Sequence, residues 1–171
     1  MPLTLPTFYA GTAPTATQFQ QLSDAVATLN NPDRCKIYYS ASGETTSSGV
    51  GLSLSFDAEA WDTNSMHNPG VNPHLITIKT DGLYDIKGAV AYGVNSTGYR
   101  LATILQGGST AIARTEILAT STVNTTVQVV TERQLVAGDT ICIQAQQNSG
   151  GTLSTIAGVE YSWLSVRRIC D

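Results

Sequence analysis

Two hydrophobic patterns divide the chain. Between Thr15 and Pro32, apolar residues recur every three or four positions, which is the spacing of one helical face. From Cys35 onwards, apolar and polar residues alternate in short runs separated by turns rich in glycine and asparagine, a pattern typical of half-buried β-strands. The sequence therefore predicts a short amphipathic helix at residues 15–31 and a β-domain at residues 32–171.

The helix has recognisable ends and one apolar stripe. Thr15 and Gln18 have the spacing of a capping box, and Pro32 stops the helix. A helix of about four turns is marginal alone in water, so its stripe must pack on its own domain or on copies of itself. The narrow stripe favours a bundle of identical helices around a symmetry axis. The stripe consists of Phe19, Leu22, Val26 and Leu29.

Residues 1–14 carry three prolines, which fix the backbone and remove donors, so they are expected to form an extended arm. The arm has too few apolar side chains for a core of its own. Two interpretations stay open: a loose terminus, and an anchoring arm that becomes ordered on a partner surface. The second is favoured. The candidate anchoring residues are Leu3, Leu5, Phe8 and Tyr9.

The longest alternating stretch of the β-region lies between Asp81 and Gln106. It predicts a strand at residues 83–94, a polar reversal and a second strand at residues 99–106, most simply as a β-hairpin. Many short strands at this spacing are typical of a two-sheet sandwich or jelly roll. The other strand candidates are residues 35–40, 50–56, 75–79, 111–119, 125–135, 140–147 and 156–168.

Composition and hydropathy argue against nucleic-acid and membrane partners. Charged residues are 13% of the chain, the formal net charge is −4, and the nine lysines and arginines are scattered, so we expect no nucleic-acid partner. The start of the chain lacks the pattern of a signal peptide, and no apolar run approaches the roughly 20 residues of a membrane span. The chain is therefore expected to be made in a cytoplasm and to have no membrane partner.

One loop region holds the residues that could support catalysis or metal binding. His67 and His74 lie near Asp57, Glu59 and Asp62. A loop rich in proline and asparagine is more often a solvated surface, and metal ligands need rigid elements with supporting bonds. The chain also lacks a nucleophile-elbow motif and a CxxC spacing. We therefore expect no catalytic residues, no metal site, no cofactor and no enzymatic activity.

Several motifs follow one another in a characteristic order across the β-region. They are Phe56-Asp57, a loop with Trp61 and Asn64, Ile76-Thr77-Ile78, Asp81-Gly82-Leu83-Tyr84, the residues Arg100 and Ile104, and the segments 135–141 and 162–166. This order resembles the C1q/TNF-like jelly-roll domain over residues 35–170. The resemblance implies an all-β fold of two sheets and a homotrimer around a threefold axis. The calcium ligands of some members have no counterpart here.

The combination of arm, short helix and jelly roll, made without a secretion signal, resembles small phage virion proteins. This resemblance implies a homotrimeric capsid decoration or minor capsid protein, of the head-fibre type, located in the virion. Its partner would be the major capsid protein or another virion protein. The alternative is the receptor- or glycan-binding knob of a phage tail fibre, in which loops 61–73 and 148–153 recognise a host-surface glycan.

The family resemblance also concerns two cysteines. In C1q/TNF-like domains the first and last strands are antiparallel neighbours, which would place Cys35 near Cys170 as a candidate disulfide. A reducing cytoplasm opposes the bond, and two unrelated thiols are the other interpretation. A Cα separation above about 7 Å would exclude the disulfide.

Overall fold

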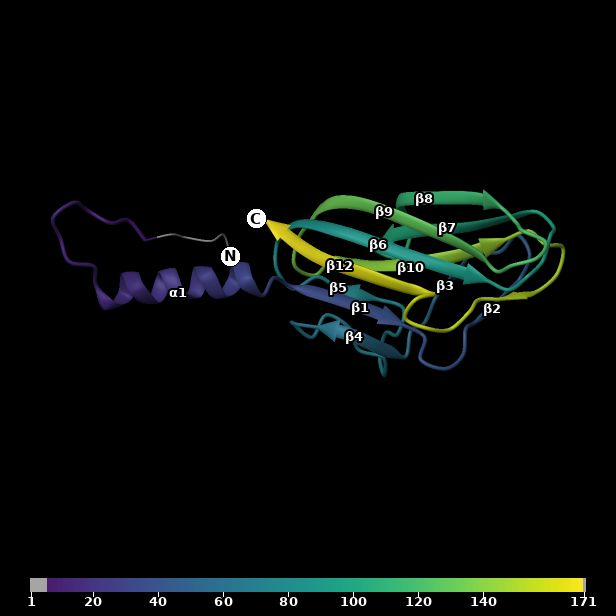
Figure 1. The fold of residues 1–171 in the computed structure, drawn as a ribbon, viewed down its shortest axis with the longest axis horizontal. Coiled ribbons are helices and arrows are strands. Elements are labelled where there is room, and N and C mark those ends of the chain that lie inside the picture. The colour runs from purple at the N-terminus through teal and green to yellow at the C-terminus, as the bar shows by residue number, and fades with distance from the viewer. Residues whose placement is uncertain (1–5, 171) are drawn as a thin grey trace.

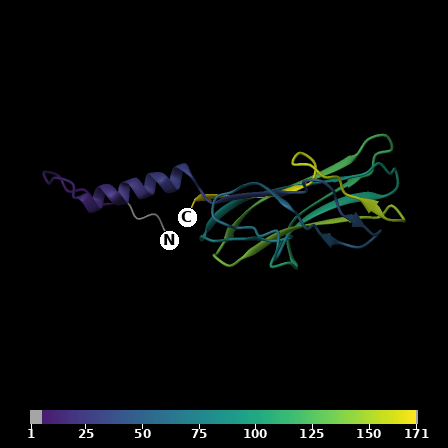
Figure 2. The ribbon, with the colours of Figure 1, turned by 90° about the horizontal axis from the view of Figure 1, so that it is seen from below.

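The protein has a helix at one end and a β-sandwich at the other (Figures 1 and 2). The computed structural model describes residues 6–170, apart from the side chains of residues 28–30. The helix, α1, comprises Ala16–Asn30, and the β-domain starts with β1 at Arg34–Tyr38. Among the described residues, no helix combines the length and the apolar character needed to span a membrane.

Local bonds define both ends of α1. The Gln18 backbone N–H donates to Thr15 Oγ1 at 3.2 Å, and the Thr15 backbone N–H donates to Gln18 Oε1 at 2.8 Å. This reciprocal pair is the predicted capping box, which satisfies N–H groups that the first helical turn leaves free. At the other end the Asn31 N–H donates to Ala27 O, and Pro32 cannot continue the helix. The predicted helix is confirmed.

Two antiparallel sheets form the β-domain. One has the order β4-β1-β12-β6-β9, and the other has β3-β10-β7-β8, with β5 also pairing to β10. A separate two-stranded pair joins β11 to β2. This architecture confirms the predicted all-β sandwich. The remaining strands are β2 (Thr45–Thr46), β3 (Leu52–Ser53), β4 (Ala58–Asp62), β5 (Ile76–Thr77), β6 (Gly82–Tyr92), β7 (Tyr99–Gln106), β8 (Thr110–Leu118), β9 (Thr125–Leu135), β10 (Thr140–Gln147), β11 (Leu153–Ser154) and β12 (Trp163–Cys170).

The hydrophobic core lies between the two sheets, and β6 shows how the alternation builds it. Tyr84 of β6 is fully buried with the other inward residues of the strand, while Lys87 and Asp85 on the opposite face form an ion pair at 2.6 Å. Gly88 belongs to the inward series. A Cβ at this position would lie 2.5 Å from Cδ1 of Ile143 in the other sheet, so glycine permits the close approach of the sheets.

The predicted hairpin between β6 and β7 is wrong. β6 pairs with β12 and β9, whereas β7 pairs with β10 and β8 in the other sheet. The connection therefore crosses the sandwich instead of closing a hairpin. Alternation along the chain reveals that a strand has a buried face, but it does not select the strand's hydrogen-bonded neighbour. Crossing to the opposite sheet lets both strands bury their apolar faces in one shared core.

Several predicted strand limits also need correction. Residues 58–62 form the edge strand β4, although the sequence predicted that the loop around Trp61 begins there. β4 is mostly exposed, so it lacks the alternation by which strands are found. The predicted strand at 50–56 shortens to β3, and the last strand begins at Trp163 instead of Ile156.

The candidate disulfide is excluded by the strand register. β1 and β12 are antiparallel neighbours, as expected, but Cys35 pairs with Val166, and Cys170 pairs with Leu83 of β6. Four residues of strand separate Val166 from Cys170, which places the cysteines about 13 Å apart along the strand. Both thiols are free, Cys35 in the core and Cys170 exposed. The prediction failed because β12 continues past the start of β1.

Candidate functional site

The N-terminal arm reverses direction at the end of the molecule farthest from the β-domain (Figure 1). The Thr12 N–H and Oγ1 both donate to Tyr9 O, at 3.3 and 2.9 Å, and Gly11 adopts a positive φ of 81° that favours glycine. The arm then lies beside α1, where Gln18 Nε2 donates to Thr7 O at 2.6 Å. The described residues of the arm form no helix or strand. The arm folds back along α1, whereas the sequence predicted an extended arm.

Two of the four candidate anchoring residues lie within the described part of the chain. Phe8 is 50% exposed and Tyr9 is 71% exposed, so a large part of each aromatic ring is left uncovered by this protomer. Leu3 and Leu5 lie outside the described residues. The arm therefore exposes two large aromatic side chains.

The apolar stripe of α1 is largely exposed. Phe19, Leu22 and Val26 are 58%, 39% and 45% exposed, and the side chain of Leu29 lies outside the described residues. In both views α1 extends away from the β-domain (Figures 1 and 2), so the stripe does not pack on its own domain. Of the two interpretations drawn from the sequence, association with another chain is the one that this arrangement supports.

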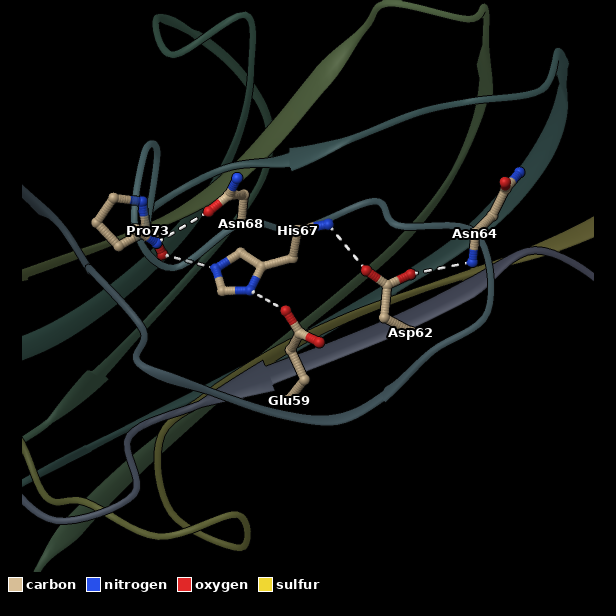
Figure 3. A network of polar contacts seen from close by, with 7 residues as sticks. Glu59, Asp62, Asn64, His67, Asn68 and Pro73 are labelled. Atoms are coloured by element: carbon tan, nitrogen blue, oxygen red, sulfur yellow. Dashed lines mark hydrogen bonds and ion pairs between the residues drawn. The ribbon is translucent and has the colours of Figure 1, made fainter.

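The side chain of His67 is fully buried, which contradicts the expectation that its loop is solvated. Its Nδ1 lies 2.9 Å from Glu59 Oε1 and its Nε2 lies 3.2 Å from Pro73 O (Figure 3). Its backbone N–H donates to Asp62 Oδ2 at 3.0 Å. The loop composition suggested exposure, but the neighbouring Met66 belongs to the core and draws this part of the loop inward.

Two aspartates of this region accept hydrogen bonds that hold the backbone in place. Asp57 accepts bonds from the Ser40 N–H and Ser40 Oγ, both at 2.7 Å, and the backbone bond is the main cause that lowers the pKa of Asp57. Asp62 also accepts from the Asn64 N–H at 3.1 Å. His74 is half-buried. Within residues 6–170, no three histidine, cysteine, aspartate or glutamate side chains are arranged to hold a metal ion.

A surface that the sequence analysis missed lies on the outer face of the first sheet. The Lys36 ammonium is 4.4 Å from the ring centroid of Trp163 and 5.5 Å from that of Trp61, within cation–π range of both. Burial between the rings lowers the pKa of Lys36. Lys36 alternates with the buried residues Cys35 and Ile37, so the sequence indicates that its side chain points outward. The sequence does not indicate that β1 pairs with β4 and β12, which bring the two tryptophans to Lys36.

The predicted recognition loop at 148–153 is firmly held at the opposite end of the molecule from α1 (Figure 1). The buried Gln147 donates through Nε2 to Thr46 O at 3.2 Å and to Gly151 O at 2.9 Å. The Gly150 N–H donates to Ser48 Oγ at 3.0 Å. The other predicted loop, 61–73, starts at Trp61, which pairs with Lys36 of β1, and the next residue, Asp62, pairs with Cys35 near the helix end of that strand. The structure therefore does not bring the two loops together.

Comparison with solved structures identifies the fold class of the protein. No protein-family model matches the sequence, and no curated protein matches it. A crystal structure of murine APRIL at pH 5.0 matches with a TM-score of 0.59 and 11% identity, covering 81% of this chain and 100% of that chain. The TNF protein Eiger from S. frugiperda matches with a TM-score of 0.57 and 14% identity, covering 82% and 95%.

The globular domain of zebrafish complement 1qA protein matches with a TM-score of 0.52 and 12% identity, covering 78% of this chain and 94% of that chain. At such low identities, the likeness concerns the fold alone. The protein therefore has the TNF/C1q-like jelly-roll fold, which confirms the fold class that the order of motifs implied.

Proposed function

We propose that the protein is a homotrimeric structural component of a virion, attached through its N-terminal segment and projecting its β-domain. The observation that carries the proposal is the exposed stripe of Phe19, Leu22 and Val26 on a helix that extends away from the domain. Because so short a helix is marginal without partners, two further copies of α1 would supply the missing burial. The trimeric state implied by the C1q/TNF-like resemblance supports the same assembly.

The elongated shape supports attachment at one end. The arm reverses at the end remote from the β-domain (Figure 1). Its Phe8 and Tyr9 are exposed, and each aromatic side chain would gain at most about 1.5–3 kcal/mol on full burial, less the entropy of ordering. Three copies multiply this gain. The partner would be the major capsid protein or another virion protein, and the protein would act by binding instead of catalysis.

A receptor- or glycan-binding knob of a tail fibre is the second candidate. The observations that favour it are the exposed Trp61 beside Lys36 and Trp163, and the firmly bonded loop at 148–153 at the end opposite the arm. Aromatic faces and preorganised polar loops are common in recognition surfaces. This candidate would be favoured if the wild-type protein binds a glycan on an array and Trp61→Ala does not.

The solution mass tests the assembly. We expect light scattering to give the mass of a trimer for the wild-type protein at micromolar concentration, and a smaller mass for the triple variant Phe19→Ser, Leu22→Ser, Val26→Ser. Gln21→Ala and Ser23→Ala, exposed on the same helix, form the matched control and should leave the mass unchanged. A monomeric wild-type protein would contradict the trimer.

Attachment is tested separately. Removing residues 1–14, or substituting Phe8→Ser together with Tyr9→Ser, should abolish binding to purified particles while circular dichroism still reports a folded β-domain. Cryo-electron microscopy of particles reconstituted with each protein would measure the occupancy. Normal decoration by the truncated protein would place the anchor elsewhere.

A further inference from the structure

Both tryptophans of the chain lie on the outer face of the first sheet. Trp61 of β4 is directly opposite Lys36 of β1. Trp163 of β12 is directly opposite Tyr38, which follows Lys36 on the same face of β1. The Lys36 ammonium is 4.4 Å from the ring centroid of Trp163 and 5.5 Å from that of Trp61. The fold therefore gathers two indole rings around one cation, with Tyr38 next to them.

Two arginines border these aromatic rings without an acidic partner. Arg34 of β1 is directly opposite Arg167 of β12, both side chains are exposed, and Arg34 Cζ lies 5.9 Å from the ring centroid of Trp61. The ion pairs among the described residues include neither arginine. Asp85 is directly opposite Arg167, but its carboxylate pairs with Lys87 at 2.6 Å. Because like charges in directly opposed positions repel, an anion bound between the arginines would stabilise this part of the sheet.

The local charge differs in sign from that of the whole chain. The formal net charge is −4, with nine lysines and arginines. Four of these nine point outward from the first sheet, namely Arg34, Lys36, Lys87 and Arg167. The acidic residues beside them are Asp85, Glu132 opposite it on β9, and Glu160, whose charge acts on Lys36. We call the surface formed by Arg34, Lys36, Trp61, Trp163 and Arg167 the basic aromatic face.

We propose that the basic aromatic face binds an acidic polysaccharide of uronate sugars, whose pyranose rings stack on the indole rings while their carboxylates pair with Arg34 and Arg167. An indole offers a large apolar face with little conformational freedom, which suits the C–H face of a pyranose ring. The guanidinium group matches a carboxylate with two parallel hydrogen bonds. The face spans three adjacent strands, β4, β1 and β12, so it suits an extended polymer.

The proposal rests on the second candidate function, that of a glycan-binding knob, and makes it more specific. It places the ligand on the outer face of a sheet, away from the loop at 148–153. A neutral polysaccharide would use the indole rings but would leave Arg34 and Arg167 without a counter-charge. The arginines therefore distinguish an acidic ligand from a neutral one.

Titration calorimetry of the full-length protein with alginate, a polymer of uronate sugars, tests the proposal. At physiological salt and without calcium, we expect binding of alginate and none of the neutral polymer dextran. Trp61→Ala and Arg167→Gln should each weaken alginate binding by at least about tenfold. Arg114→Gln, which removes the same charge from an exposed position on β8 of the other sheet, is the matched control and should keep the wild-type affinity.

Glu160→Gln tests the sign of the charge. Loss of this carboxylate near Lys36 should strengthen alginate binding by up to about fivefold, and weaker binding would contradict an anionic ligand. Circular dichroism checks that each variant is folded, and Arg167→Gln still decides if Trp61→Ala does not fold.

The remaining outcomes separate this proposal from the proposed functions. Absence of alginate binding by the wild-type protein, or equally tight binding of single-stranded DNA, would overturn it. Tight binding of dextran that is lost in Trp61→Ala would overturn the acidic ligand and keep the glycan-binding knob. A smaller light-scattering mass for Trp61→Ala, without binding of alginate, would show that the face joins copies of the chain. Binding of alginate by a monomer would confirm the proposal and contradict only the trimer.

Discussion

The β-domain and the N-terminal segment use their apolar side chains in opposite ways. In the β-domain, Phe56 and Ile104 are fully buried, whereas Phe19 of α1 and Tyr9 of the arm are more than half exposed. Both regions have aromatic and aliphatic residues, but the core cluster of the described residues lies in the β-domain. The β-domain therefore has a core of its own, whereas the segment leaves its large apolar side chains largely uncovered.

The hydrogen bonds of the two regions differ in the sequence separation of the residues that they join. In the segment, the Gln18–Thr7 bond joins residues 11 positions apart, and Gln20 donates to Asp24 only four positions away. In the domain, the Glu44 N–H donates to Thr155 Oγ1, 111 positions away. Local bonds form and break with their own helix, whereas distant ones form only with the whole fold, so the two regions should respond separately to mutation.

The largest expected effect comes from removing matched phenylalanines. The Phe56 ring is fully buried, and its centroid lies 4.7 Å from that of Tyr39. Phe56→Ala should destabilise the β-domain by about 3–5 kcal/mol, because loss of the ring leaves a cavity. Phe19→Ala should leave the urea midpoint of the domain unchanged and weaken self-association. Urea unfolding and light scattering measure the two effects. Equal destabilisation of the domain by both variants would break the comparison.

A smaller effect is expected for Tyr92→Phe. The buried Tyr92 hydroxyl donates to Leu101 O at 2.6 Å and accepts from the Gln146 N–H at 3.0 Å, so its removal leaves buried partners unsatisfied and should cost about 1–3 kcal/mol.

Gln20→Ala, which removes an exposed helical bond to Asp24, is the counterpart in the segment. It should cost only about 0.2–0.5 kcal/mol of helix stability and should not move the unfolding transition of the domain. Chemical denaturation followed by tryptophan fluorescence measures the stability of the domain, because both tryptophans, Trp61 and Trp163, lie in it, and circular dichroism measures the loss of helix in the segment. A Tyr92→Phe variant as stable as the wild-type protein would contradict the expected difference between buried and exposed bonds.

The smallest effect concerns pH. The Ser40 backbone N–H lowers the pKa of Asp57 in the folded protein, so the ionised carboxylate favours folding at pH values above the usual aspartate value of about 3.9. This contribution is lost as the pH falls through the lowered value. Since Asp57 is exposed, the contribution is less than about 1 kcal/mol.

Asp57→Asn should therefore lower the unfolding free energy of the domain at neutral pH, and its difference from the wild-type protein should vanish in acid. Asp24→Asn on α1 is the control in the other region and should leave domain unfolding unchanged at each pH. A difference between Asp57→Asn and the wild-type protein that grows as the pH falls would contradict the assigned sign.

The candidate site illustrates where sequence reasoning stopped. The exposed stripe of α1 was found because its residues repeat at helical spacing, and the structure places Phe19 and Val26 on the surface. For His67 the sequence predicts a solvated loop, because its neighbours in sequence are polar. Its partners Glu59 and Pro73 come from two sides of the loop, and only packing of Met66 into the core brings them to the ring.

Local features of the protein follow from residues that are close together in the chain. The sequence predicted the capping box of Thr15 and Gln18, the inward face of β6, and the separation into a helical segment and an all-β sandwich. These features depend on groups within a few positions of one another, so each is nearly independent of the remaining chain.

The pairing of segments that are far apart in the chain depends on the packing of the whole domain. The tertiary structure placed β6 and β7 in different sheets, put Cys35 opposite Val166 instead of near Cys170, and brought Lys36 between Trp61 and Trp163. Strands with similar alternation can pair in several registers at similar local cost. The choice among them is made by burying all apolar faces in one close-packed core, which no local pattern encodes.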